Sequence, residues 1–139
     1  MIIIKAIKYI MKIICVNKVK GLTVGKEYDV IKTDGEFTRT MGYFVINDYN
    51  LMERYERSPM GIIEVMELTD IFKEYVGPEH RGLTIGKTYQ ILDDRCGYYY
   101  FLNDNDKFVG ITKINYFGGE PMFKVVDKTQ INLNELPNR

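Results

Sequence analysis

The chain has 139 residues, with 19 lysines and arginines against 19 aspartates and glutamates, so its formal net charge is zero. A chain without net positive charge has no overall field that attracts a polyanion or an acidic membrane, which argues against a histone-like or polybasic role. Apolar residues at 45% and charged residues at 27% are typical of a folded globular protein.

Residues 1–10 form an isoleucine-rich segment. Lysines interrupt it and no small-residue cleavage site follows, which argues against an export signal. Its lysines stand at helical spacing whereas its isoleucines favour a strand, so both alternatives stay open. No stretch of the sequence approaches the ~20 apolar residues of a membrane span. With Cys15 and Cys96 as its two cysteines, the chain is expected to be a cytoplasmic protein with reduced thiols and no membrane contact.

An internal repeat organises most of the remaining chain. Residues 21–31 recur as residues 82–92 at an offset of 61, with the shared pattern Gly-Leu-Thr-x-Gly-Lys-x-Tyr. A second anchor, Tyr-Phe-Val-Ile-Asn-Asp at 43–48, matches Tyr-Tyr-Phe-Leu-Asn-Asp at 99–104 at an offset of 56. Copy two has therefore lost five residues, and the loss falls in the turn between the anchors.

Each copy shows the pattern of short β-strands. After a leading strand comes the glycine turn, and then Tyr28 and Val30 alternate with polar neighbours at period two. The apolar anchors end in Asn-Asp, whose side chains can cap a tight hairpin. About five short strands in about sixty residues are typical of a small barrel. The leading strands lie at 12–16 and 73–76, which aligns Cys15 with Val76, and the closing strands lie at 61–68 and 122–126.

The Leu-Thr-x-Gly-Lys-x-Tyr-x-Val stretch, followed by an apolar strand ending in Asn-Asp, resembles the small SH3-like β-barrels encoded by many bacteriophages and some of their bacterial hosts. The resemblance implies an all-β fold of two tandem SH3-like, five-stranded barrels at 11–68 and 69–126. Residues 1–10 precede them, and a polar tail at 127–139 is expected to fray. A unit of about sixty residues buries little of its surface alone, so we expect the two barrels to pack against each other.

The repeated glycines Gly25 and Gly86 predict tight turns with a positive φ. A phosphate-binding loop needs four residues between its glycines, whereas this repeat has three, and copy one has Glu27 where that loop requires a hydroxyl. The residues that follow are strand-like, which also argues against the loop-to-helix geometry of a phosphate site. Tyr28 and Tyr89 are predicted to be buried rings whose hydroxyls reach the barrel rim.

The catalytic inventory is nearly empty. His80 and Ser58, the single histidine and serine, lie in non-equivalent loops, so no serine triad is predicted, and His80 is interpreted as a solvated turn residue. Cys15 is predicted to be buried and Cys96 to be an exposed turn residue, and this set lacks the ligands for zinc. We therefore predict that the chain is not an enzyme and has no cofactor and no metal site. Four aspartates that could hold a cation fall instead at predicted turns: Asp93, Asp94, Asp104 and Asp106.

Surface residues remain as candidates for function. Aromatic residues without an aromatic counterpart in the other copy are the better candidates for contact with a partner, because their rings offer large amphipathic area. The longer turn of copy one adds an arginine beside such a ring. The predicted partner-binding residues are Phe37, Arg39, Tyr49, Tyr55 and Tyr98.

Two functions compete on these observations. The first is a protein-binding module, which the phage resemblance would make an accessory protein that inhibits or redirects a host protein, such as a defence or toxin component, by stoichiometric binding. The second is a nucleic-acid-binding adaptor, because residues 1–32 hold seven lysines against two acidic residues and could give copy one a basic face. The empty catalytic inventory, the zero net charge and the unmatched aromatics favour the first.

Overall fold

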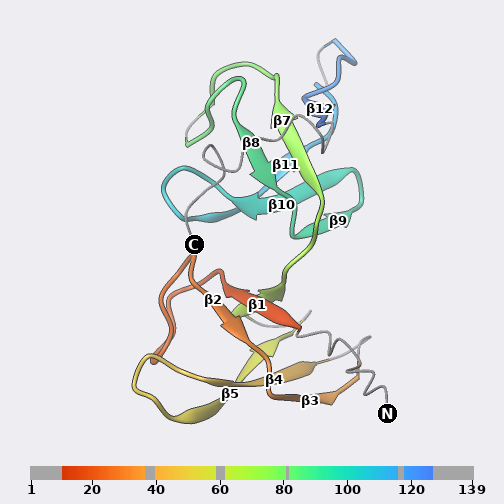
Figure 1. The fold of residues 1–139 in the computed structure, drawn as a ribbon. Helices are drawn as coiled ribbons and strands as arrows, with labels where there is room; N and C mark the ends of the chain where they lie inside the picture. The colour runs from red at the N-terminus through yellow and green to blue at the C-terminus, as the bar shows by residue number, and fades with distance from the viewer. Residues whose placement is uncertain (1–10, 37–39, 59–61, 81, 116–117, 127–139) are drawn as a thin grey trace, which may run out of the picture.

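The computed structural model of the protein describes residues 11–36, 40–58, 62–80, 82–115 and 118–126. Over these residues the chain is entirely β, with twelve strands in four three-stranded antiparallel sheets and no helix. Strands β1 to β6 form half one and strands β7 to β12 form half two, and the two halves are stacked end to end (Figure 1). The predicted all-β fold is confirmed.

Half one consists of two sheets that enclose a common core. Their strand orders are β2-β1-β6 and β3-β4-β5. The alternation of apolar and polar residues noted in the sequence decides which side of each strand faces that core. The strands are β1 (Lys12–Cys15), β2 (Glu27–Asp29), β3 (Lys32–Gly35), β4 (Met41–Ile46), β5 (Met52–Arg57) and β6 (Val65–Glu67).

Half two repeats this arrangement. Its two sheets have the orders β8-β7-β12 and β9-β10-β11, which match those of half one strand for strand. The internal repeat of the sequence is thus a repeat of the topology. The strands are β7 (Phe72–Tyr75), β8 (Thr88–Gln90), β9 (Asp93–Arg95), β10 (Tyr98–Leu102), β11 (Phe108–Thr112) and β12 (Phe123–Val125).

Each half has six strands where five were predicted, and neither half closes into a complete barrel. The extra strand comes from a bend. The amide of Val30 donates to the Met11 carbonyl in the first sheet, and the next amide, that of Ile31, donates to the Phe44 carbonyl in the second sheet, both at 2.8 Å. The chain therefore passes from β2 in one sheet directly to β3 in the other, and half two bends in the same way after β8. Strands β3 and β9 lie in residues that were predicted as the turn between the two anchors, so that part of the prediction is wrong.

The leading strands show that the predicted alignment of Cys15 with Val76 between the two copies is wrong by one residue. The Cys15 carbonyl accepts from the amide of Gly25, and the equivalent acceptor in half two is the carbonyl of Tyr75, each at 2.8 Å. Val76 is therefore the counterpart of Val16. A shift of one residue moves a side chain to the opposite face of a strand, so Tyr75, and not Val76, takes the place in the core of half two that Cys15 has in half one.

Strand β1 is buried on both faces, which explains its unbroken apolar run. Ile13 and Cys15 face the core of half one, where they pack with Tyr43, Val45 and other residues. Ile14 and Val16, which alternate with them, face away from that core and are also fully buried. A strand with one face in solvent would have carried polar residues at these two positions.

A third apolar cluster joins the halves. Ile14, Val16 and Met66 of half one pack with Leu92 and Leu102 of half two. Figure 1 shows the corresponding geometry, with the β9-β10-β11 sheet at the base of half two, directly above β1. The expectation that the two copies pack against each other agrees with this shared core. We call this cluster the joint.

Candidate functional site

The repeated sequence motif forms a hydrogen-bonded clamp around an aspartate. In half one the Asp48 carboxylate accepts from the Thr23 hydroxyl at 2.7 Å, from the Lys26 ammonium at 2.7 Å and from the Tyr28 hydroxyl at 2.9 Å. The Tyr28 hydroxyl in turn accepts from the Thr23 amide, and the Asp48 amide donates to the Gly21 carbonyl. The motif therefore ties the glycine turn to the end of β4.

The same clamp is present in half two. Asp104 accepts from the hydroxyl of Thr84 at 2.7 Å, from the hydroxyl of Tyr89 at 3.0 Å and from the ammonium of Lys87. Burial raises the pKa of Asp104, but these three donors outweigh it and hold that pKa below the ordinary carboxyl value. The hydrogen bond from Lys26 is the main cause that lowers the pKa of Asp48. Because both halves share the clamp, it is part of the fold and not a site specific to either half.

The predictions for this motif are largely confirmed. Gly25 and Gly86 have φ of +85° and +86°, and no helix follows them, as expected for a turn. The rings of Tyr28 and Tyr89 are buried while their hydroxyls reach the clamp. The Asn47 side chain caps the hairpin as predicted, by accepting from the amides of residues 49 and 51.

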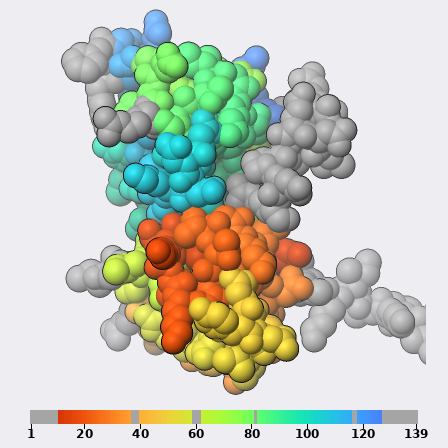
Figure 2. All heavy atoms as spheres, turned by 90° about the vertical axis from the view of Figure 1, so that its left-hand side faces the viewer, coloured from red at the N-terminus to blue at the C-terminus, as the bar shows by residue number. Residues whose placement is uncertain are grey.

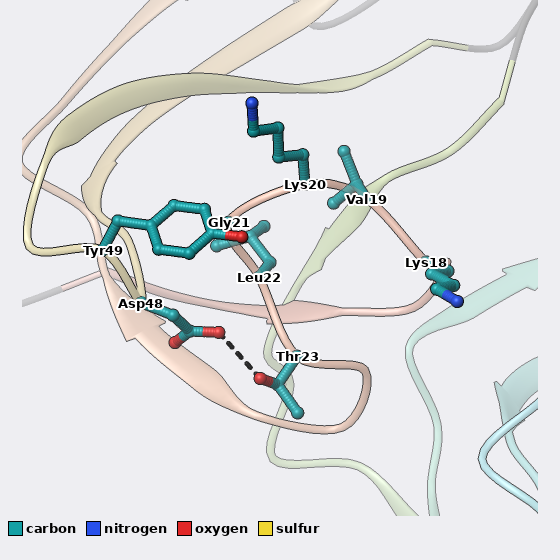
Figure 3. A pocket seen from close by; sticks show the side chains of 8 residues that line it. All are labelled: Lys18, Val19, Lys20, Gly21, Leu22, Thr23, Asp48 and Tyr49. Carbon is teal, nitrogen blue, oxygen red and sulfur yellow. Dashed lines mark hydrogen bonds between the residues drawn. The ribbon is translucent and has the colours of Figure 1, made fainter.

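A shallow hollow of about 550 Å³ lies beside the clamp of half one. Figure 3 shows the ring of Tyr49 reaching toward Gly21, with the Lys20 side chain extending outward. The clamp is also visible there, because the carboxylate of Asp48 points at Thr23. The hollow is lined by Lys18, Val19, Lys20, Gly21, Leu22, Thr23, Asp48 and Tyr49.

The tip of the β4–β5 hairpin is an exposed apolar surface next to this hollow. Ile46 and Met52 form its last cross-strand pair, and Tyr49 and Leu51 belong to its loop. Their exposed fractions are 47%, 52%, 61% and 55%, respectively. Figure 2 shows the yellow part of the chain, which contains this loop, on the surface of half one. We call these four residues the hairpin tip.

The predicted contact residues differ in their exposure. Tyr49 is exposed at the hairpin tip. Tyr55 is 5% exposed, its ring is part of the core of half one, and its hydroxyl donates to the Lys20 carbonyl, so its prediction as a surface contact is wrong. Tyr98 is half-buried on β10 in half two, its ring 6.3 Å from that of Tyr100. Phe37 and Arg39 lie outside the described residues.

Four exposed aliphatic residues were not predicted as contacts: Ile31, Ile46, Leu51 and Met52. The sequence held a signal for Ile46, because residues 43–46 form an unbroken apolar run, whereas a strand with one solvated face alternates apolar and polar residues. The contact residues were predicted mainly from aromatic side chains without a counterpart in the other copy, and this excluded aliphatic residues. Such a run indicates that both faces of β4 are apolar.

The lysines of half one do not form one basic face. Lys12 pairs with Asp29 at 3.2 Å, and Lys26 is held by the clamp. Lys18 and Lys20 remain beside the hollow, where Asp48 is a neighbour. Two of the described lysines of residues 11–32 therefore pair with carboxylates, while Lys18 and Lys20 share the hollow.

Residues considered for chemistry occupy structural positions. His80 is exposed in a turn, Cys15 is buried and Cys96 is exposed, as predicted. Asp93 and Asp94 were predicted in a turn but lie in strand β9. There Asp93 pairs with Arg95, and Asp94 pairs with Lys113.

Within the described part of the chain, no group of three metal-ligating side chains comes together and no helix has the length and apolarity to cross a membrane.

Comparison with known proteins yields no relative: the chain matches no protein-family model, no curated protein and no solved structure.

Proposed function

We propose that this protein is a non-enzymatic module that binds another protein, with the hairpin tip of half one at the centre of the interface. The observation that carries the proposal is the exposure of four large apolar side chains, each close to or above one half, around a single hairpin. Adjacent exposed apolar side chains are a feature of interaction surfaces, because leaving them in water is unfavourable.

The setting of the hairpin tip supports this function. Asn47 and the clamp hold the loop at both sides, so the chain offers a preordered surface. Preorder lowers the entropy lost on binding. The hollow next to Tyr49 adds a concave region with lysines at its edge, and an apolar centre with a charged rim is typical of protein interfaces. By the phage resemblance, the partner would be a host protein bound in fixed stoichiometry.

A photo-cross-linking experiment tests this function. The full chain with Tyr49 replaced by p-benzoylphenylalanine is irradiated in a bacterial extract, and adducts are identified by mass spectrometry. We expect one discrete protein adduct that an excess of the unmodified chain suppresses. The same group at Val125, an exposed residue of half two, serves as the matched control and should give no such adduct. Equal adducts from both positions, or no protein adduct, would contradict the proposal.

A nucleic-acid-binding adaptor is the second candidate, and the observation in its favour is the presence of Lys18, Lys20 and Tyr49 around one hollow. Single-stranded nucleic acids bind where basic side chains flank an exposed ring. Such binding falls steeply as salt rises from about 50 to about 200 mM. Tight binding of labelled RNA or DNA with that salt dependence, lost when both lysines are changed to glutamine, would favour this candidate over protein binding.

A further inference from the structure

The two halves place equivalent residues at the joint of one and on the surface of the other. Ile31 and Leu92 each follow the bend of their half and donate an amide hydrogen bond to the second sheet, at 2.8 Å in both cases. Ile46 pairs with Met52 across its hairpin, as Leu102 pairs with Phe108. The three residues Ile31, Ile46 and Met52 are therefore the counterparts of Leu92, Leu102 and Phe108. We call the first set the outer face of half one.

The burial of the two sets differs sharply. Leu92 and Leu102 are 5% and 7% exposed, because residues of half one cover them. Ile31 and Ile46 are 53% and 47% exposed. The same position in the same fold is thus a buried interface in half two and an open surface in half one. Figure 1 shows the β3-β4-β5 sheet at the free end of half one, on the side away from half two.

The joint shows what this kind of face binds. Two of its covering side chains, Ile14 and Met66, are directly paired in the antiparallel strands β1 and β6. The third, Val16, directly follows β1. These side chains are aliphatic and project from one face of a strand pair. The side chains that cover Leu92 and Leu102 are therefore mainly those of one apolar face of a strand pair, with Val24, Ile63 and Leu68 packed beside them.

We infer that the outer face of half one binds a partner protein through an aliphatic face of two paired β-strands, in the way that half two receives β1 and β6. This inference rests on the proposed protein-binding function and specifies the chemistry of the partner. The hairpin tip contributes Ile46 and Met52 to the outer face, so the two surfaces are continuous.

A second copy of the chain does not supply such a surface. Ile14, Val16 and Met66 are covered by half two, so they are not available to another molecule. Their counterparts in half two, from the register of β7 with β12, are Glu74, Val76 and Lys124. Two of these three are charged, and burying them against isoleucine and methionine would be unfavourable. Head-to-tail growth through repeated joints is therefore disfavoured.

The charges beside the outer face are already paired. Arg54 donates to Asp34 at 2.9 Å and also pairs with Glu56, while the ammonium of Lys32 lies 4.6 Å from the ring centre of Phe44. A partner does not need to supply a compensating charge for these groups. Because the centre of the outer face is apolar and the charged side chains around it already interact with one another, the outer face favours a partner with an uncharged aliphatic surface over a charged one.

The test uses a probe made from the joint itself. A backbone-cyclised hairpin peptide carries residues 12–16 and 64–68, with Cys15→Ser, and a fluorescent label reports its binding to the full chain by anisotropy. Cyclisation is needed because a free two-stranded hairpin is marginally stable. We expect saturable binding that is weakened about tenfold or more by Ile46→Glu or Met52→Glu in the chain, because each would place a charge in an apolar contact.

Matched controls define the face on each side. Val125→Glu changes an even more exposed apolar residue, on half two, and should leave the affinity unchanged. In the peptide, changing Ile14 and Met66 to threonine should abolish binding, while changing Ile13 and Val65 on its opposite face should not. Circular dichroism of each chain variant confirms that a loss of binding is not a loss of folding.

Several outcomes would overturn the inference. Binding that is insensitive to both changes on the outer face would do so, as would a concentration-dependent dimer in sedimentation that Met52→Glu abolishes, because the occupant would then be a second copy. Probe binding that appears only after removal of residues 1–10 would assign the face to that segment. A protein adduct at Tyr49 without probe binding would leave the proposed function in place and overturn this inference alone.

Discussion

The two halves share a topology and a motif, yet three equivalent positions are buried or partly buried in half two and exposed in half one. Leu92, Leu102 and the ring of Phe108 lie at the joint, whereas Ile31 and its neighbours face solvent. Because the chain has two copies, residues that maintain the fold can be distinguished from residues that act in one half only. What both halves retain, the clamp above all, maintains the fold, and what differs between them is where function is to be sought.

The largest expected difference between the halves concerns their equivalent residues Leu102 and Ile46. Leu102→Ala should lower the free energy of unfolding by about 2–4 kcal/mol, because it leaves a cavity in the joint. Ile46→Ala should cost less than about 1 kcal/mol, because the side chain is already half in solvent. Urea denaturation of both variants measures this difference. Equal losses would show that the joint contributes no more to stability than the exposed hairpin.

The clamps predict nearly equal effects in the two halves. Asp48→Asn or Asp104→Asn removes the charge that three donors share, and an amide group cannot accept from all of them. Each change should lower the free energy of unfolding by about 1–2 kcal/mol, since the clamps are partly screened by solvent. Thermal denaturation provides the measurement. A large effect in one half and none in the other would contradict the view that the clamp serves the shared fold.

Acid should weaken both clamps together. The folded-state pKa of Asp48 and of Asp104 is lower than the ordinary value of 3.8, so each carboxylate contributes full stability above that value. The contribution is lost as the pH falls from about the ordinary value through the lowered one. The melting temperature of the native chain should therefore fall more steeply below about pH 4 than that of a variant with Asp48→Asn and Asp104→Asn. Parallel curves would refute a role for these two groups.

The glycine turns predict a similar cost in each half. A β-carbon at Gly86 would meet no atom within 4 Å, so the cost of Gly86→Ala comes from its φ of +86° alone. At Gly25 the nearest atom is the Asp106 carboxylate oxygen at 3.5 Å, an ordinary contact. Both changes should cost about 1–2 kcal/mol, as read from urea denaturation, and should leave probe binding intact. A loss of binding without a loss of stability would assign the turn a functional role.

The sequence carried enough information to predict the repeat, the strands, the capping asparagine and the turns with positive φ. These features depend on local chemistry, such as the freedom of glycine and the side-chain oxygen of Asn47. The alignment of β7 with β1 could not be predicted from local sequence. One additional residue in the loop after Val76 displaces the alignment, and the residues of a loop contain no periodicity that would reveal it.

The site was less predictable than the fold. Tyr49 was identified because its ring has no counterpart, but the same criterion selected Tyr55, whose hydroxyl finds partners inside the half. A tyrosine can satisfy its hydroxyl in a core or at a surface, so its residue type does not decide between them. Ile31 and Ile46 are exposed because half one covers the equivalent face of half two, while the described residues of neither half cover this face of half one. Local sequence does not reveal this, because it depends on how the two copies pack together.

The smallest expected effect concerns the two cysteines, one in each half. Burial raises the pKa of the Cys15 thiol to about 11, and its sulfur donates to the carbonyl of Asn17, so it should react slowly. Cys96 is exposed in the tight turn between β9 and β10 and should react at once. Titration of the native chain with Ellman's reagent should show one fast thiol, which Cys96→Ser removes, and a second only in denaturant. Two fast thiols in the native chain would mean that the core of half one opens readily, and the stability assigned to its side of the joint would then be too high.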